Sequence, residues 1–370
     1  METTTLNFQR LLSQAKEEKK PSHTPFLPVF GESTTSKKAN EQNTGLFTIG
    51  KPADGKPEEK NKDNTSKSTN KNKVVTREFA ANFTLHLLET PWRSVNWTSE
   101  SREELMEKVQ SYKPASEAVS EARVLLLGPV GAGKSSFISS VQSVFSGRVI
   151  NRAMVGSSAS TSFTKKLQSF PIRRSGERSD PTALVLCDIM GIGEGDSTGL
   201  SLYDALCVIK GHVLEGHQFV AEQPVTFDTM SIIKKPSLRD KIHCVVFVVD
   251  ASKINSYAKG LSTTFQQLRQ NISSLGVHQV ALLTHVDEVC TDTSRDVSQV
   301  YKSRSIQQLM VKAGALLGMA TSYIVPVRNY SFQLELDQNT DILLLNAVDH
   351  ILQYTDLYFK DTAVDYKVTN

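Results

Sequence analysis

Several features that define other protein classes are scarce in this sequence of 370 residues. It has four cysteines, Cys187, Cys207, Cys244 and Cys290, and none forms a C-x-x-C pair, so no disulfide framework is indicated. No apolar run is long enough to span a bilayer, and the first residues lack the apolar core of a signal peptide. We therefore expect a cytoplasmic protein with reduced, buried thiols.

The sequence also lacks an excess of charge of either sign. Its net charge is +3, and residues 1–75 hold 13 Lys/Arg against 9 Asp/Glu, which leaves 29 against 30 for the rest of the chain. A nucleic-acid-binding domain needs a dense basic face to displace counterions from phosphates, and none is indicated. We expect no nucleic-acid partner and no membrane-spanning segment.

Composition divides the chain into two parts. Residues 1–76 are rich in polar residues, proline and glycine without a sustained apolar period, which predicts a disordered low-complexity tail. In residues 77–370, strand-like apolar runs alternate with helical periodicity, which predicts one α/β domain with a doubly wound, mostly parallel sheet. The predicted strands are 124–127, 166–172, 183–187, 243–249, 279–283 and 322–325, and helices are predicted at 135–145, 203–213 and 340–358.

A helical lead-in at 77–120 precedes the first predicted strand of this domain. Its helix is predicted to begin with a capping box, formed by Ser101 and Glu104. Both tryptophans of the chain, Trp92 and Trp97, lie in the lead-in. Tryptophans beside an amphipathic helix favour packing over partner binding, so we expect the lead-in to pack on the domain.

The most informative motif follows the first predicted strand. Residues 128–135 (GPVGAGKS) match the phosphate-binding loop G-x-x-x-x-G-K-[ST], and helical periodicity begins directly after it. The glycines allow successive backbone N–H groups to point at a di- or triphosphate. We expect Lys134 to reach the β- and γ-phosphates and the Ser135 hydroxyl to bind Mg²⁺. The predicted loop residues are Gly128, Pro129, Val130, Gly131, Ala132, Gly133, Lys134, Ser135 and Ser136.

Two further segments are predicted to complete the metal and γ-phosphate side of the site. Asp188 and Gly191, in D-I-M-G, follow a predicted strand, where a P-loop protein places its Mg²⁺-holding carboxylate and an N–H that faces the γ-phosphate. Residues 160–164 (STSFT) offer hydroxyls, of which we favour Thr161, with Thr164 second. The predicted metal ligands are therefore Ser135, Thr161 and Asp188, and the predicted catalytic groups are Lys134 and Thr161.

The base-reading motif is predicted at Thr284-His285-Val286-Asp287, directly after a strand. GTPases usually carry N/T-K-x-D here. The carboxylate of Asp287 can accept hydrogen bonds from N1–H and the exocyclic amine of guanine, which adenine cannot supply. Thr284 fits the pattern, whereas His285 replaces the usual lysine and can instead cover the base plane. Asn329 lies in the segment after the last predicted strand, where we expect a loop near guanine O6.

The sequence is less favourable for hydrolysis. Small GTPases place a glutamine directly after D-x-x-G to orient the attacking water, and Ile192 stands there instead, so we expect slow turnover. Two functions stay open: a GTP-dependent switch or slow GTPase, and a scaffold that binds nucleotide without productive hydrolysis. An ATP-dependent enzyme is disfavoured by Asp287. The expected ligands are GTP or GDP with Mg²⁺, and the expected partners are unidentified proteins, with nucleotide-dependent self-association as one candidate.

Five segments resemble the interferon-induced protein 44 family. They are 90–98 (TPWRSVNWT), 123–145 (RVLLLGPVGAGKSSFISSVQSVF), 235–252 (KPSLRDKIHCVVFVVDAS), 280–287 (VALLTHVD) and 325–331 (VPVRNYS). The resemblance covers about residues 80–355. It implies a cytoplasmic, guanine-nucleotide-binding protein of interferon and antiviral responses, with T-H-V-D as the family's own form of the base motif. Longer members carry an N-terminal TLDc-like domain, and functions of that domain are not transferred to this chain.

Overall fold

The computed structural model describes residues 87–150, 164–174, 180–193, 199–220, 223–226 and 232–368. All of these belong to the unit Ser66–Asn370. The tail predicted at 1–76 lies outside the described residues. The strands are β1 (Ala122–Leu127), β2 (Gln168–Arg173), β3 (Pro181–Asp188), β4 (Cys244–Asp250), β5 (His278–Thr284) and β6 (Ile324–Pro326). The α-helices are α3 (Ser99–Gln110), α4 (Lys134–Ser146), α5 (Leu202–Ile209), α6 (Lys259–Ser274), α7 (Thr291–Arg295), α8 (Arg304–Leu317) and α9 (Gln338–Val368), and 3-10 helices span Leu238–Asp240, Val297–Tyr301 and Thr321–Tyr323.

The six strands form one sheet in the order β2-β3-β1-β4-β5-β6. Strands β3, β1, β4, β5 and β6 run parallel, and β2 pairs antiparallel with β3 at one edge. β1, which leads into the phosphate loop, lies between β3 and β4. The later strands therefore extend the sheet on both sides of β1. The predicted doubly wound, mostly parallel α/β fold is confirmed.

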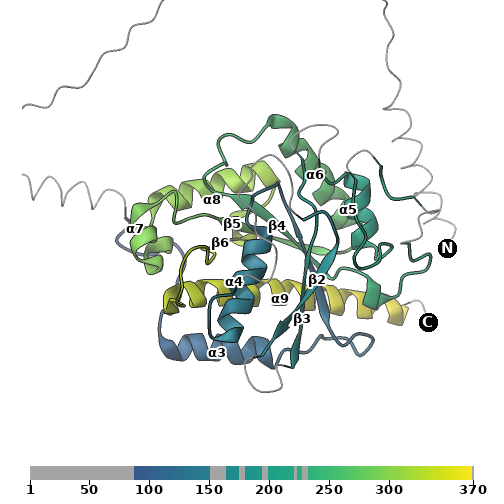
Figure 1. The fold of residues 1–370 in the computed structure, drawn as a ribbon, viewed down its shortest axis with the longest axis horizontal. Coiled ribbons are helices and arrows are strands. Elements are labelled where there is room, and N and C mark those ends of the chain that lie inside the picture. The colour runs from purple at the N-terminus through teal and green to yellow at the C-terminus, as the bar shows by residue number, and fades with distance from the viewer. Residues whose placement is uncertain are drawn as a thin grey trace, which may run out of the picture. The chain divides into compact units, whose positions relative to one another are not determined.

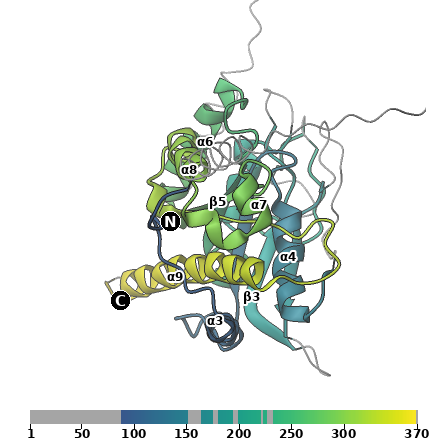
Figure 2. The same ribbon diagram turned by 90° about the vertical axis from the view of Figure 1, so that its left-hand side faces the viewer.

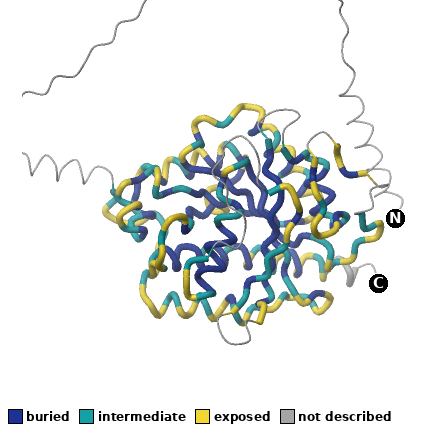
Figure 3. Tube along the Cα trace, in the orientation of Figure 1, coloured by how far each residue is buried: buried dark blue, intermediate teal, exposed yellow. Residues whose placement is uncertain are grey.

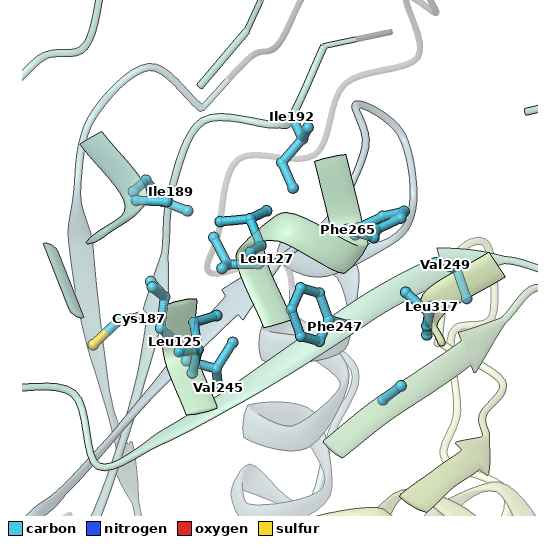
Figure 4. Packing of buried hydrophobic residues seen from close by; sticks show 14 of the residues in the cluster. Leu125, Leu127, Cys187, Ile189, Ile192, Val245, Phe247, Val249, Phe265 and Leu317 are labelled. Atoms are coloured by element: carbon cyan, nitrogen blue, oxygen red, sulfur yellow. The ribbon is translucent and has the colours of Figure 1, made fainter. Parts of the chain in front are cut away.

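The sheet is buried on both faces, as a parallel sheet requires. Every residue of β4 is buried. Its side chains alternate between two apolar clusters: Val245, Phe247 and Val249 enter the cluster with α5, α6 and α8, whereas Val246 and Val248 enter the one with α3, α4 and α9. Figures 1 and 2 show these helices on the two sides of the sheet, Figure 3 shows the strands as a buried centre, and Figure 4 shows the cluster around Phe247.

Several helix boundaries differ from the sequence predictions, and the C-terminal helix predicted at 340–358 spans Gln338–Val368 in the structure. The capping box predicted at Ser101 is wrong, because α3 begins at Ser99 and its cap is Thr98, whose hydroxyl accepts from the Ser101 N–H at 3.3 Å. A threonine is itself a good cap, and the earlier start satisfies the first-turn N–H groups three residues sooner. The helix predicted at 203–213 ends at Ile209, because Gly211 adopts a φ of 79° and turns the chain away.

The lead-in and the cysteines behave as expected. Trp92 packs edge-on against the buried Tyr301, with ring centroids 4.9 Å apart, and Trp97 lies on the same ring at 6.3 Å. Arg93 donates to the carbonyls of Thr321 and Ile324, which fastens the lead-in beside β6. All four cysteines are buried and free, so the expectation of reduced thiols in the core is confirmed.

Candidate nucleotide-binding site

The phosphate loop connects β1 to α4, at the edge of the sheet where the parallel strands end (Figure 1). Gly131 and Gly133 have φ values of 73° and 89°, which are left-handed conformations that favour glycine. Gly128 packs so closely on β4 that an added Cβ would lie 2.1 Å from the carbonyl oxygen of Val248. Helix α4 begins at Lys134, so its unpaired N-terminal N–H groups face the loop, and the segment has the backbone of an anion site.

Lys134 is buried inside this loop, with 6% of its surface exposed. Its Nζ donates to the carbonyl oxygens of Gly128 and Pro129, both at 2.9 Å. Burial lowers the pKa of Lys134 to about 8, and the nearby carboxylate of Asp188 acts in the opposite direction. Within the described part of the chain the hydrogen-bond acceptors of this ammonium are backbone carbonyl oxygens, which carry no full counter-charge, so the loop offers a cation to an anionic ligand.

Two hydroxyls and one carboxylate meet beside the loop. The Ser135 hydroxyl donates to Asp188 Oδ2 at 2.5 Å, the Thr164 hydroxyl donates to the same oxygen at 3.1 Å, and the two hydroxyl oxygens lie 3.3 Å apart. Asp188 is 1% exposed, and burial raises its pKa, against the opposing effect of Lys134. Three oxygens at such distances, around a buried carboxylate, have the donor chemistry that Mg²⁺ prefers.

No group of three or more His, Cys, Asp or Glu side chains in the described ranges could hold a metal ion. A magnesium ion in a phosphate site needs only one or two carboxylates, because phosphates and waters complete its coordination. The side chains of Ser135, Thr164 and Asp188 therefore fit a metal ion that binds together with a nucleotide. They do not resemble a metal cage built from protein ligands alone.

The segment after Asp188 lies directly against the phosphate loop. The Ile192 N–H donates to the Gly128 carbonyl at 3.0 Å, and an added Cβ at Gly191 would lie 2.8 Å from the Val130 N atom. Gly191 is therefore required by close approach to the loop. The Ile192 side chain is 3% exposed and belongs to the apolar cluster in Figure 4. The residue at the usual glutamine position thus points into the core and cannot orient water.

The end of β5 is tied to both the phosphate loop and β4. Thr284 is fully buried, and its hydroxyl oxygen lies 2.8 Å from the carbonyl oxygen of Ala132 and 3.1 Å from that of Val249. Both are acceptors only, so the hydroxyl donates to one of them and accepts from Nδ1–H of His285 at 2.9 Å. His285 itself has a φ of 56°. An added Cβ at Gly133 would lie 3.4 Å from each of the Thr284 and His285 side chains, so the predicted base motif borders the loop.

Asp287 and Asn329 come from the loops after β5 and β6. The Asp287 carboxylate lies 3.5 Å from Nε of Arg328, and both side chains are mostly buried, at 19% and 16% exposure. Asn329 Nδ2 donates to the carbonyl of Gly133 at 3.2 Å, while its buried Oδ1 has no hydrogen-bond partner within the described segments. The Asp287 carboxylate, the loop after β6 and the phosphate loop are therefore linked by successive contacts.

The structure thus brings together the predicted loop residues, Asp188, Gly191, the Thr284 motif and Asn329. Ser136 lies in the first turn of α4. Thr161 lies outside the described residues, whereas Thr164, the second choice in the sequence analysis, reaches Asp188. Sequence reasoning gave no role to Arg328, although it precedes Asn329 in a segment that was already singled out.

Several known proteins are similar to this chain in sequence. Interferon-induced protein 44-like of Homo sapiens is 34% identical over 267 residues, which are 72% of this chain and 58% of that protein. Interferon-induced protein 44 of Homo sapiens is 35% identical over 269 residues, or 73% and 60%. This chain is related to the interferon-induced protein 44 family. The family resemblance seen in the sequence is therefore confirmed.

The interferon-induced protein 44 of Mus musculus is 34% identical over 257 residues, or 70% of this chain and 60% of that protein. The chain spans about 60% of the length of the curated relatives that it matches. No protein-family model matches it. Similar solved structures include a probable GTP-binding protein engB, with 10% identity over 63% of this chain and 98% of that chain and a TM-score of 0.32. Another is an Era variant of Aquifex aeolicus bound to GDP·AlF4⁻, with 11% identity over 63% and 56% and a TM-score of 0.32.

Within the ranges that the structure describes, no helix combines the length and the apolar character needed to cross a membrane.

Proposed function

We propose that this protein binds GTP and GDP with Mg²⁺ and acts as a slow GTPase or GTP-dependent switch. We propose further that it acts in the cytoplasm, in the interferon-induced antiviral response. The observation that carries the proposal is the meeting of three groups at the end of β1. Lys134 is buried within the phosphate loop, and Ser135 donates to the buried Asp188 at 2.5 Å. The relationship to interferon-induced proteins supports the cellular context.

Each group has a definite task in this proposal. The N–H groups of the loop and of the first turn of α4 bind the phosphate oxygens, and Lys134 exchanges its two carbonyl partners for the β- and γ-phosphates. Ser135, Thr164 and Asp188 are the residues that would hold Mg²⁺. Bound Mg²⁺ neutralises phosphate charge. We propose Thr161 as the further hydroxyl on the γ-phosphate side and, with Lys134, as a catalytic group.

The switch would act through two segments that meet at Asp188. The Thr164 hydroxyl donates to Asp188 on one side, and Gly191 lies against the phosphate loop on the other. A γ-phosphate that draws the Thr164 hydroxyl away from Asp188 would change the partners of both segments, because, among the described residues, Asp188 Oδ2 would then keep only the Ser135 hydroxyl as a donor. The surface that a protein partner, or a second copy of the chain, could bind would then differ between the GTP-bound and GDP-bound states.

A second candidate function is a scaffold that binds nucleotide without a productive cycle. This candidate is favoured by apolar side chains at the place where hydrolysis needs a polar group to orient water. Ile192 is directed into the core, and Val130 lies against Gly191. Neither side chain can position water, so binding without turnover is consistent with this part of the site.

Titration with fluorescent GTP, GDP and ATP analogues tests nucleotide binding. We expect selective binding of guanine nucleotides, and Asp287→Asn should weaken it and favour xanthine nucleotides, because the amide presents a donor where guanine also presents one. Binding of ATP as tightly as GTP would contradict the base assignment. Failure to bind any nucleotide would contradict both candidate functions.

Single-turnover hydrolysis separates the two candidates. The wild-type rate is compared with that of Lys134→Ala over a range of protein concentrations, since self-association could supply missing groups. A wild-type rate above the Lys134→Ala rate at any concentration supports the GTPase. Equal rates at every concentration reject it and leave the scaffold.

A further inference from the structure

The base motif of this chain lacks a cation that the usual N/T-K-x-D pattern provides. His285 occupies the lysine position, and its Nδ1 is engaged with the Thr284 hydroxyl at 2.9 Å. The same nitrogen lies 3.4 Å from Asp250 Oδ1. The ring is therefore held toward the ends of β4 and β5, and position 285 does not carry the ammonium that is usual there.

An ammonium from another element lies on the phosphate loop. Lys253, in the turn after β4, places its Nζ 3.4 Å from the position that a Cβ would occupy at Gly131. Its side chain is 43% exposed, so the charge is available to a ligand. In the sheet register Asp250, which precedes this turn, lies beside Thr284, so the turn begins next to the base motif although it is far from it in the sequence.

Asp250 fixes the position of Lys253. One carboxylate oxygen, Oδ1, accepts from the N–H and hydroxyl of Ser252 at 2.9 and 2.6 Å. The other, Oδ2, pairs with Lys253 Nζ at 3.2 Å. The Asp250 N–H donates to the Tyr257 hydroxyl at 3.0 Å, which closes the turn around the pair. The carboxylate is 4% exposed, so it acts as a buried anchor for a partly exposed cation.

We propose that Lys253 is a nucleotide-binding residue, which supplies from the β4 turn the ammonium that His285 leaves out of the base motif. It contacts phosphate or ribose oxygens of a bound guanosine di- or triphosphate beside Gly131. The inference rests on the proposed nucleotide site. In this arrangement two lysines lie at the phosphate loop: Lys134, whose ammonium donates to loop carbonyls, and Lys253.

The test is a titration of the full chain with fluorescent GDP and GTP analogues. Lys253→Met removes the charge and keeps the length of the side chain. Lys312→Met is the matched control, because Lys312 Nζ donates to Asn255 in the same turn at 2.8 Å but is not placed on the phosphate loop. Thermal unfolding verifies that both variants fold. A third variant combines Lys253→Met with His285→Lys, which returns a lysine to its usual position.

Support requires that Lys253→Met weaken GDP and GTP binding about tenfold, the size expected for one charge-assisted contact, while the preference for guanine over adenine is kept. Lys312→Met should bind as the wild type does, and His285→Lys should recover most of the loss. Wild-type affinity in Lys253→Met, an equal loss in Lys312→Met, or no recovery in the double variant would overturn the inference. Absence of binding in the wild type would instead contradict the proposed nucleotide site itself.

Discussion

Arg328 Nε lies 3.5 Å from Oδ2 of Asp287, so the carboxylate that is proposed to read guanine is held from the loop after β6. Both side chains are mostly buried, which limits the screening of the pair by solvent. Each carboxylate oxygen has two lone pairs, so Asp287 can keep this partner while it accepts from guanine. We therefore expect Arg328 to orient the carboxylate for the proposed base contact.

Replacing Arg328 with methionine should weaken guanine-nucleotide binding about tenfold, because the carboxylate loses its orientation and its counter-charge. The loss should be smaller than that in Asp287→Asn, in which the acceptor itself is changed. The measurement is a GDP titration, and Arg295→Met, an exposed residue at the end of α7, is the control. Tighter GDP binding in Arg328→Met would show that Arg328 competes with guanine for Asp287.

Thr284 connects the base motif to the phosphate loop, and a second prediction follows from this contact. Thr284→Val keeps the shape of the side chain but removes the hydroxyl bonded to the Ala132 carbonyl at 2.8 Å. We expect a loss of about 1–3 kcal/mol in the free energy of unfolding, because a buried acceptor loses its donor. Guanine and adenine nucleotides should lose affinity by the same factor, since the loop is affected and the base contact is not.

Urea unfolding and nucleotide titration measure these two effects. Thr284→Ser is the control, because it keeps the hydroxyl and loses only a methyl group. It should stay closer to the wild type in both measurements. A selective loss of guanine binding in Thr284→Val would instead mean that the hydroxyl touches the base.

Much of the fold and of this site could be predicted from the sequence, because the signals are local. The phosphate loop needs glycines at fixed positions, and Gly131 and Gly133 adopt the left-handed conformations that the motif requires. Asp188 follows a continuous apolar strand, so its place at the sheet edge follows from the strand itself. Such features depend on a few neighbouring residues, and they are read without knowledge of the tertiary structure.

Other features depend on contacts between distant segments. The Thr164 hydroxyl bonds a carboxylate 24 residues further along the chain, and a local sequence pattern does not encode such a contact. Lys253 reaches the phosphate loop only because β4 lies between β1 and β5 in the sheet. The start of α3 was misjudged because Thr98 and Ser101 are both good caps, and local propensity does not rank them.

The position after D-I-M-G provides a third prediction. Ile192→Gln introduces the residue that small GTPases use, but the side chain at this position is buried in the apolar cluster of Figure 4. We expect no gain in hydrolysis and a loss of about 2–4 kcal/mol in the free energy of unfolding, because an amide is placed among apolar side chains. The measurements are single-turnover hydrolysis and urea unfolding.

Ile192→Val is the matched control for this change, since it removes one methylene and adds no polar group. Its loss of stability should be about 0.5–1.5 kcal/mol. Faster hydrolysis in Ile192→Gln without loss of stability would mean that the segment turns outward when nucleotide is bound.

A fourth prediction concerns a buried histidine at the start of β4. His243 is fully buried, its Nδ1 accepts from the Arg123 N–H at 2.9 Å, and its Nε2 lies 2.9 Å from the Leu238 carbonyl. A carbonyl only accepts, so Nε2 carries the proton and the neutral ring satisfies both contacts. Protonation would place a second N–H against that of Arg123. Burial lowers the pKa of His243 from 6.5 to about 4; the hydrogen bond to the Leu238 carbonyl acts in the opposite direction, and the charges of Arg123 and Lys241 lower the pKa further.

The unfolded chain therefore takes up this proton at a higher pH than the folded chain does. The contribution of His243 to stability is complete above pH 6.5 and is lost as the pH falls from 6.5 toward 4. Between pH 7.5 and pH 5.0 we expect the wild type to lose about 2 kcal/mol more than His243→Asn, which keeps an acceptor for the Arg123 N–H but does not titrate. Urea unfolding of both proteins at the two pH values measures the difference, in which the effects of the other histidines cancel. An equal loss in the two proteins would show that the ring is already protonated, or free of its partners, at pH 5.0.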